Sequence, residues 1–264
     1  MKPLEILNQV QNDQGAFSFS KIGTFGSMKV LFLTDGIHPF QIGGMQKHST
    51  ILIGLLLERG VEITVVHPGG HNYSPEAFVT LFGLSHELKE CQIDFPKTDS
   101  LPGHYVRENK KYSEQAYRQL EEELPTFDVI YAQGFTAWFF LKKRESGELK
   151  VPVLVNFHGF EMFQKPPSLR VKAEYTLLRK TVRWMIRKAD YVYSFGAQID
   201  EVLKKLGVEQ ERILLQSNGI RGEWLSDKVQ SHDKMNFIFI GRNERRKGII
   251  ELNGVLEKMV KTNQ

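Results

Sequence analysis

Apolar positions along the chain alternate between short runs and longer segments with a helical period. Residues 30–33 form a short apolar run, residues 45–58 repeat with a helical period, and residues 63–66 form a β-branched run. Gly60 follows the periodic segment, in the place where helices commonly end. A buried strand, a crossover helix and a second buried strand make the βαβ unit of a parallel sheet. The sequence therefore predicts that residues 28–66 open an α/β fold.

The same alternation continues towards the C-terminus. Further strands are predicted at 128–132, 151–157, 191–194 and 212–215, and further helices at 112–124, 135–143, 169–188 and 198–206. Residues 71–110 lack a sustained period, so we expect long loops there, with one or two short strands such as 91–93. Strands that alternate with helices at this spacing predict a Rossmann-like parallel sheet with helices on both faces.

Changes in the pattern divide the chain into four segments. Residues 1–27 are polar without a period, and we interpret them as a disordered or extraneous extension before a natural start at Met28; a short capping helix is the alternative. Residues 28–220 form the first domain, and 221–235 are polar like a linker. Residues 236–264 begin a second α/β unit with a strand at 236–240 and a helix at 248–260. Because one strand and one helix do not form a stable domain, we expect this unit to be incomplete and the chain to be truncated.

Composition narrows the class of protein. The chain has 264 residues, a net charge of +4 and a pI near 9.0, which suits an anionic ligand or an anionic membrane surface. The single cysteine, Cys91, cannot form an intrachain disulfide, so nothing indicates an oxidising compartment. The longest weakly charged apolar stretch, 129–141, is too short to span a bilayer. We expect a cytoplasmic protein without a nucleic-acid partner.

Candidate binding residues follow the predicted strands, because ligands of doubly wound sheets bind outside the carboxyl ends of the strands. Gly43 and Gly44 fall where the first helix begins, and the free N–H groups there favour an anionic or polar ligand. A plain turn is the alternative. The chain contains neither G-x-G-x-x-G nor G-x-x-x-x-G-K-[ST], so the dinucleotide fingerprint and the P-loop are both excluded.

Three further residues have side chains suited to a sugar phosphate. His158 ends a buried strand and precedes a glycine, so its ring can bond a sugar hydroxyl or phosphate, or accept a proton. Arg242 and Lys247 lie on a loop before a helix, where two cations suit a diphosphate. The alternatives are a histidine satisfied by local backbone and a solvated basic loop.

The order and spacing of several motifs resemble one family. The chain carries in order KVLFLTDG, GGMQKH, VPVLVNFHG, ADYVYSFGAQIDEVLKKLGV, SNGI and FIFIGRNERRKG. Residues 28–264 thereby resemble a GT-B glycosyltransferase of family 4. The resemblance implies two Rossmann-like domains with the active site in the cleft between them. It also implies sugar transfer from a nucleotide-diphosphate sugar to a saccharide or lipid-linked acceptor, with retention at the anomeric carbon.

The resemblance also implies a role for each matching residue. His158 is the expected catalytic residue near the transferred sugar, and Gln46 is an expected acceptor contact. The expected donor-binding residues are Gly43, Gly44, Arg242 and Lys247. No metal or cofactor is expected besides the donor substrate. The absence of D-x-D agrees with this, because cations would stabilise the leaving group in place of a metal.

Two departures from the family pattern limit these expectations. Gln133 and Gly134 follow a predicted strand like the other candidates, but Gln133 stands where the family often has histidine, which leaves its role in doubt. The E-x7-E motif of the second domain is missing, since Glu251 and Glu257 have the wrong spacing. We therefore expect little or no transfer activity from this chain. A non-catalytic module that binds an acceptor or partner is one alternative. Another GT-B enzyme, such as a sugar-nucleotide epimerase or a glycogen-type synthase, is a second.

The predicted helix at 169–188 is strongly basic. Seven of its residues are Lys or Arg, against the single acid Glu174, and Trp184 lies among them. Such a segment could rest on anionic lipid at the inner membrane face. A solvated face on a core helix is the alternative, because the apolar residues of the segment must also pack on the sheet.

Overall fold

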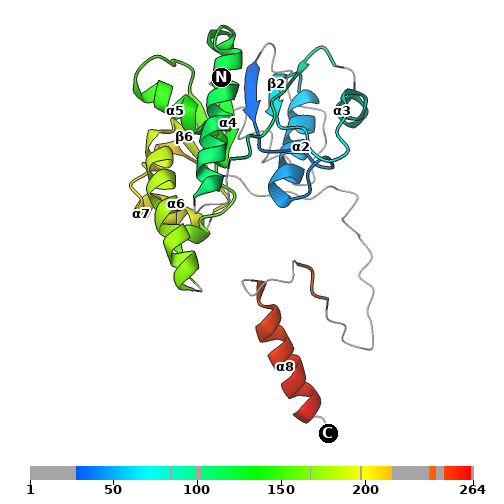
Figure 1. Ribbon diagram of the computed structural model, residues 1–264, viewed down its shortest axis with the longest axis vertical. Helices are drawn as coiled ribbons and strands as arrows, with labels where there is room; N and C mark the ends of the chain where they lie inside the picture. The colour runs from blue at the N-terminus through cyan, green and yellow to red at the C-terminus, as the bar shows by residue number, and fades with distance from the viewer. Residues whose placement is uncertain are drawn as a thin grey trace. The chain divides into compact units, whose positions relative to one another are not determined.

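The computed structural model describes residues 28–83, 85–98, 103–166, 168–196, 198–215, 238–241 and 247–262 (Figure 1). The chain divides into two compact units, Met1–Ile220 and Arg221–Gln264. The predicted extension 1–27 and the predicted linker 221–235 lie outside the described residues.

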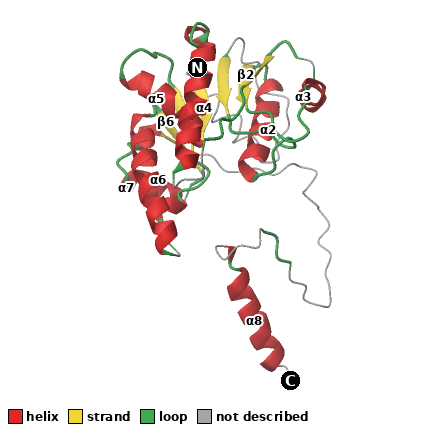
Figure 2. Cartoon of the chain, viewed as in Figure 1, coloured by secondary structure: helices red, strands yellow, loops and turns green. Residues whose placement is uncertain are grey.

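The first unit is built on a seven-stranded sheet in which every neighbouring pair is parallel (Figure 2). The strand order is β3-β2-β1-β4-β5-β6-β7. The strands are β1 (Lys29–Leu33), β2 (Glu62–His67), β3 (Leu88–Gln92), β4 (Val129–Gln133), β5 (Val153–Asn156), β6 (Tyr191–Ser194) and β7 (Ile213–Leu215). This order and direction confirm the predicted Rossmann-like parallel sheet.

Helices cover both faces of this sheet. They are α2 (Gly44–Leu57), α3 (Pro75–Phe82), α4 (His104–Leu120), α5 (Trp138–Glu145), α6 (Leu169–Lys188) and α7 (Gln198–Lys205). Figure 1 shows α2 and α3 on one side and α4 to α7 on the other. Each group packs into its own buried cluster, with Leu52 and Phe78 in one and Tyr112 and Val182 in the other. Right-handed crossovers account for this division, because the strand order runs outward from β1 in both directions.

The predicted loops at 71–110 contain a helix that the prediction missed. Helix α3 begins after Ser74, whose hydroxyl accepts a hydrogen bond from the Ala77 N–H at 3.1 Å. Pro75 occupies the first helical turn and Glu76 is acidic there, which are both start signals. Phe78 is the only residue of the helix that is fully buried, so the helix leaves no sustained apolar period. The predicted strand at 91–93 is β3, which begins earlier.

Helix α4 also begins earlier than the predicted 112–124. It starts after Gly103, whose φ of 83° is a left-handed value that favours glycine. Val106 and Asn109 extend the buried stripe of the helix back from Tyr112. The predicted helix 135–143 instead starts as a short 3-10 turn, Gly134–Ala137, before α5. The other 3-10 turns are Leu124–Thr126, Glu161–Phe163 and Gln210–Arg212.

Helix α6 and strand β6 have the predicted boundaries. Val182, Met185 and Ile186 of α6 are fully buried against the sheet, while Arg183 and Arg187 are exposed. The helix therefore belongs to the core on one side and presents basic residues on the other.

The second unit contains helix α8 (Ile249–Thr262), close to the predicted 248–260. The predicted strand at 236–240 is not confirmed, because its described residues 238–240 have no strand structure. Ile238 and Ile240 are 82% and 91% exposed. A strand needs a neighbour to pair its backbone, and none is present within the described part of this unit.

Candidate functional site

The candidate site lies at the carboxyl edge of the sheet, where β1 and β4 are neighbours. Strand order reverses direction between these two strands, because β1 leads through α2 to β2 on its other side. Such a switch point leaves a crevice at which ligands of this fold class bind. Thr34 follows β1, Gln133 ends β4, His158 follows β5, and α2 begins at Gly44 beside them. The topology therefore brings segments more than 100 residues apart to one edge.

Gln133 lies at the centre of this site, although the sequence left its role in doubt. Its side-chain Oε1 lies 2.6 Å from Nε2 of His158. Its Nε2 lies 3.4 Å from Nδ1 of His48 and donates to the Ser49 hydroxyl at 3.2 Å. One buried amide thus joins strand β4, helix α2 and the loop after β5.

The two histidines form a cluster with an aromatic residue from the next loop. The ring centroids of His48 and His158 are 4.8 Å apart, and Phe195 lies 5.3 Å from His158. We call His48, Gln133, His158 and Phe195 the histidine cluster. Burial lowers the pKa of His48 to about 4. Burial, together with the nearby His48, lowers the pKa of His158 to about 3. Both rings are therefore neutral at pH 7.

A carboxylate and an amide meet beside this cluster. Gln46 Nε2 of α2 donates to Oδ1 of Asp35 at 3.0 Å. Burial raises the pKa of Asp35 to about 6, although the bond from Gln46 acts in the opposite direction. A Cβ at Gly43 would lie 2.0 Å from Oε1 of Gln46. Gly43 thus leaves the space in which the Gln46 side chain folds back over the start of the helix.

Gly44 has a different environment. A Cβ on Gly44 would meet no described atom within 4 Å, so packing does not require glycine there. No side chain caps the start of α2 within the described part of the chain. Free N–H groups at an uncapped helix start can bind an anion or a polar group. The donor-binding role expected for Gly43 and Gly44 stays a prediction.

Hydrogen bonds beneath the site fix the loop after β1. The Thr34 hydroxyl donates to the Gly36 carbonyl at 2.8 Å and lies 3.1 Å from the Ser49 hydroxyl. Tyr112 of α4 donates its hydroxyl proton to the Thr34 carbonyl at 3.1 Å. These buried groups are satisfied by one another, so the loop that carries Asp35 is held from below.

The structure brings together only part of the predicted site. His158, Gln46, Gly43 and Gly44 lie at one edge of the first unit. Lys247 is exposed in the second unit, and Arg242 lies outside the described residues. Among the described residues, no group of three or more His, Cys, Asp or Glu could hold a metal ion.

Sequence reasoning assigned no site role to four residues of this edge, namely Asp35, His48, Gln133 and Phe195. Each had a detectable signal. Three of them end or closely follow a strand, and the fourth lies in the quoted motif GGMQKH. A rule that considers every polar or aromatic residue after each predicted strand would have found Asp35, Gln133 and Phe195.

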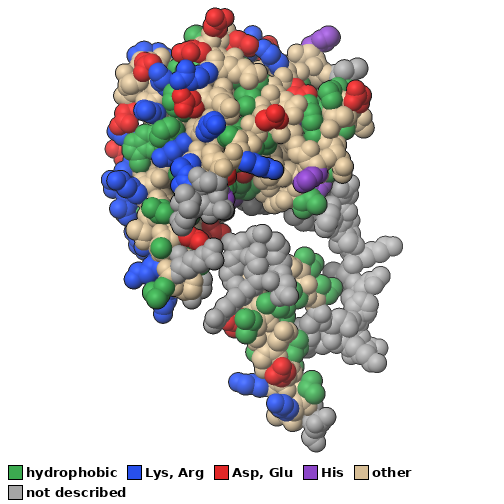
Figure 3. All heavy atoms as spheres, in the orientation of Figure 1, with side chains coloured by type: hydrophobic (Ala, Val, Ile, Leu, Met, Phe, Trp, Pro, Cys, Tyr) green, Lys and Arg blue, Asp and Glu red, His purple; other side chains and the backbone are tan. Residues whose placement is uncertain are grey.

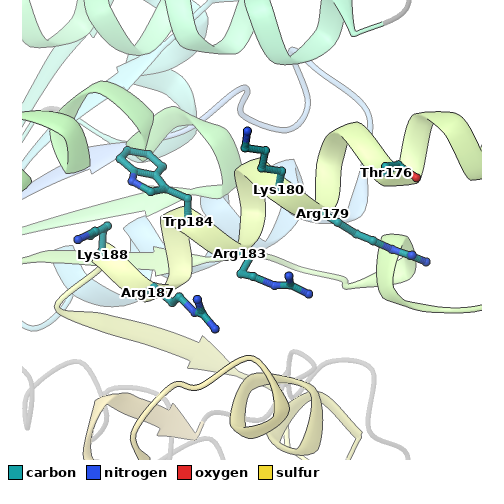
Figure 4. Close-up of a pocket in the computed structure, with 7 residues that line it drawn as sticks. All are labelled: Thr176, Arg179, Lys180, Arg183, Trp184, Arg187 and Lys188. Atoms are coloured by element: carbon teal, nitrogen blue, oxygen red, sulfur yellow. The ribbon is translucent and has the colours of Figure 1, made fainter.

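A second surface feature lies on α6, away from the histidine cluster. A hollow of about 590 Å³ is lined along this helix by Thr176, Arg179, Lys180, Arg183, Trp184, Arg187 and Lys188. Figure 4 shows Arg179, Arg183 and Arg187 projecting in one row, with Lys180 and Trp184 in a neighbouring row. Figure 3 shows Lys and Arg side chains along the side of the first unit where α6 lies. We call the five cations of this hollow the α6 basic face.

None of the helices in the described residues is long and apolar enough to cross a membrane.

Comparison with known families shows to which family the chain belongs. A sequence model of Glycosyltransferase Family 4 matches residues 42–223, which is more than half of the chain. The chain belongs to glycosyltransferase family 4. The matched range contains β2 to β7 and the whole histidine cluster, whereas β1 and Asp35 lie before it. A comparison with curated proteins finds no match.

Solved structures of several glycosyltransferases and of one epimerase are similar to the chain. Anabaena HepE, in complex with UDP and glucose, is 16% identical over 73% of this chain and 45% of its own, with a TM-score of 0.41. The lipopolysaccharide outer core galactosyltransferase WaaB is 15% identical over 78% and 50%, with a TM-score of 0.49. UDP-N-acetylglucosamine 2-epimerase from Rickettsia bellii is 16% identical over 70% and 43%, with a TM-score of 0.42.

The chain thus spans about half the length of these solved structures. Sequence identities and TM-scores this low carry no argument for a shared substrate.

Proposed function

We propose that this glycosyltransferase family 4 chain takes part in the transfer of a sugar from a nucleotide-diphosphate sugar to a saccharide or lipid-linked acceptor. The reaction retains the configuration at the anomeric carbon and needs no metal, as the family resemblance implies. His158 contacts the transferred sugar, and Gln46 contacts the acceptor. Gly43 and Gly44 approach the donor through their backbone, and Arg242 and Lys247 hold its diphosphate.

One observation carries this proposal. The histidine cluster and the Asp35–Gln46 pair occupy the switch point of the sheet, beside the uncapped start of α2. Neutral imidazoles, an amide and a partly buried carboxyl are groups that bind sugar hydroxyls, and Phe195 supplies an aromatic face beside them. The chain belongs to a family of glycosyltransferases, and the groups of its site suit sugar hydroxyls. Both observations support a sugar as the substrate.

Product analysis tests the proposal. The chain is incubated with UDP-glucose and a panel of saccharide and lipid-linked acceptors, and the products are identified by NMR and mass spectrometry. We expect a slow reaction, in keeping with the little activity expected from the sequence, that yields UDP and a glycoside whose anomeric configuration equals that of the donor. The yield should be equal in the presence of EDTA. A product of inverted configuration, or a reaction abolished by EDTA, would contradict the mechanism.

The same experiment separates the alternatives. Conversion of UDP-N-acetylglucosamine into another nucleotide sugar without an acceptor would indicate an epimerase. Binding of an acceptor or of UDP-glucose without any product would indicate a binding module. The variant His158→Ala is compared with the wild type in the same assay, and His104→Ala is its matched control. The His104 side chain is 46% exposed on α4 and pairs only with Glu108 of its own helix within the described residues.

We also propose that the surface of an anionic membrane is a partner of the first unit. The rings of Trp138 and Trp184 lie 6.1 Å apart where α5 and α6 meet. Lys110 lies 4.6 Å from the Trp138 ring, and Lys142 lies 5.7 Å from it. Tryptophans flanked by lysines suit the interface between lipid head groups and water.

The α6 basic face extends this surface, although part of it is engaged within the protein. Lys188 pairs with Glu145 at 2.9 Å, and Arg187 donates to the Leu206 carbonyl at 2.9 Å. Lys180 and Arg183 are exposed and have no ion pair within the described part of the chain. These two cations are therefore available to lipid phosphates.

Co-sedimentation with vesicles tests this contact. We expect binding to vesicles that contain phosphatidylglycerol and none to pure phosphatidylcholine vesicles. The double variant Lys180→Glu/Arg183→Glu should abolish binding. The control Lys205→Glu alters a 78% exposed lysine on α7 and should leave binding unchanged. Equal binding by the double variant and the wild type would contradict the proposal.

A further inference from the structure

The side chain of Gln133 contacts both histidines of the site, each with a different atom. Its Oε1 lies 2.6 Å from Nε2 of His158, and its Nε2 lies 3.4 Å from Nδ1 of His48. We propose that Gln133 is a positioning residue that holds His48 and His158 as the Nε2–H tautomer, so that His158 presents Nδ1 as an acceptor for a hydroxyl of the sugar.

The tautomers follow from the chemistry of the amide. A glutamine Oε1 can only accept, so Nε2 of His158 must carry the proton of that hydrogen bond. A glutamine Nε2 can only donate, so Nδ1 of His48 must be free of a proton. In a neutral imidazole one nitrogen carries a proton and the other does not, which leaves His158 Nδ1 as an acceptor.

The rest of the site fixes the amide in this orientation. Gln133 Nε2 also lies 3.2 Å from the Ser49 hydroxyl and 3.4 Å from the Tyr131 hydroxyl. The Ser49 hydroxyl donates its own proton to the Met45 carbonyl at 3.1 Å, so it acts as an acceptor towards Gln133. Asn156 Nδ2 in turn donates to the Tyr131 hydroxyl at 2.8 Å. A reversed amide would direct its oxygen at Nδ1 of His48 and its nitrogen at Nε2 of His158, so both rings would have to exchange tautomers.

The outward nitrogen of His158 remains open. No hydrogen bond to His158 Nδ1 is found within the described part of the chain, whereas Nε2 is engaged by Gln133. Burial keeps both rings neutral, since the pKa of His158 is lowered to about 3 and that of His48 to about 4. A neutral ring with a free acceptor nitrogen binds a hydroxyl, which can donate, and offers nothing to an unprotonated phosphate oxygen.

The identity of the ligand, a sugar hydroxyl, rests on the proposed function. The tautomer of His158 does not rest on it. The tautomer of His158 is a property of the free protein. It can be measured without substrate, so a failure of the tautomer claim and a failure of the transferase proposal give separate results.

Nitrogen NMR of the ¹⁵N-histidine-labelled chain at pH 7 reads the tautomer of each ring directly. We expect the Nε2–H form for His48 and His158 in the wild type. Gln133→Leu should release His158 into a mixture of both tautomers. Gln133→Glu should shift His158 towards the doubly protonated form, because a carboxylate in contact with the ring raises its pKa.

Two internal references show that such changes are specific. His67 is buried next to other partners, so its signals report any general loss of structure. Gln46→Leu removes another buried amide of the same edge without touching either histidine, so it should leave the tautomers of His48 and His158 unchanged. A wild-type His158 that carries its proton on Nδ1 would overturn the proposal. A tautomer that is the same in wild type, Gln133→Leu and Gln133→Glu would overturn it as well.

A titration with inorganic sulfate at constant ionic strength tests the consequence for ligands, because sulfate carries no proton at pH 7. We expect the signals of His158 to stay in place, since an oxygen that can only accept finds no proton on Nδ1. Protonation of His158, or a saturable shift of its signals on addition of sulfate, would overturn the claim that this nitrogen is an acceptor for hydroxyls.

Discussion

Two histidines, His67 and His158, lie at the same edge of the sheet but have opposite environments. His67 ends β2, and both its ring nitrogens are used: Nε2 lies 2.8 Å from Glu90, and Nδ1 accepts from the Gly69 N–H at 3.0 Å. Its ring also stacks on Phe78, 5.3 Å away. His158 has one nitrogen engaged, by a neutral amide, and its ring is partly exposed.

The difference separates a structural histidine from a candidate functional one. Both pKa values are lowered by burial, so the pKa alone does not distinguish them. The two histidines are distinguished by how many of their ring nitrogens have a hydrogen-bond partner within the protein, because only a nitrogen without one can bind a ligand. His67 is enclosed by Tyr73, Phe78 and Glu90, whereas His158 is partly exposed and is bonded through one nitrogen to Gln133.

The largest expected effect concerns His158 and catalysis. His158→Ala should reduce the rate of sugar transfer by roughly 10²- to 10⁴-fold, because a positioned imidazole commonly contributes this much. The free energy of unfolding should fall by only about 1 kcal/mol, since one hydrogen bond is lost. Initial rates and urea unfolding measure the two effects. A variant that loses stability but keeps its rate would make His158 structural, like His67.

His67→Ala should show the opposite pattern. We expect the free energy of unfolding to fall by about 2–4 kcal/mol, because a fully buried ring is removed and Glu90 keeps only the Tyr73 hydroxyl as a partner within the described residues. The rate per folded molecule should stay close to that of the wild type. Urea unfolding and rates normalised to the folded fraction measure this. A large rate loss at unchanged stability would show that the comparison is wrong.

The pH dependence of stability should separate the titrating groups of the site. The pKa values of His48 and His158 are lower in the folded protein than the 6.5 of a histidine in the unfolded chain. Their contribution to the free energy of unfolding is therefore fully present above pH 6.5 and is lost as the pH falls below it. Asp35, raised from 3.8 to about 6, acts in the opposite way: its contribution is present below 3.8 and is lost as pH rises through 6.

Asp35→Asn should therefore steepen the loss of stability between pH 7 and pH 5, because the compensating protonation is removed. His158→Gln should make that loss shallower. The free energy of unfolding in urea at both pH values gives the slopes, with His104→Gln as the exposed control. If Asp35→Asn has the wild-type slope, Asp35 does not titrate in this window.

The smallest expected effects distinguish the two glycines at the start of α2. Gly43→Ala should lower the free energy of unfolding by about 1 kcal/mol, because the new Cβ displaces Gln46 from Asp35. The φ of Gly43 is 168°, so no backbone strain is involved. Gly44→Ala should leave stability unchanged or slightly higher, because its Cβ meets open space. Equal effects of the two variants would contradict the packing role of Gly43.

Local patterns were sufficient for most of the elements. The apolar period of 169–188 and the Gly60 stop signal predicted α6 and the end of α2, because helix period and capping act within a few residues. Helix α3 was missed although Ser74 and Pro75 marked its start, since its single fully buried residue gives no period. The strand at 236–240 was predicted from composition alone, and composition does not supply a partner strand.

The sequence by itself determined the order of strands and helices, and with it the parallel sheet and the family resemblance on which His158 and Gln46 were chosen. Tertiary structure alone decided that Gln133, 85 residues from His48 and 25 from His158, lies between them. Strand order and register set that meeting, and both depend on contacts between distant segments rather than on any local pattern. For the same reason, only the fold could distinguish His158, with its open nitrogen, from the satisfied His67.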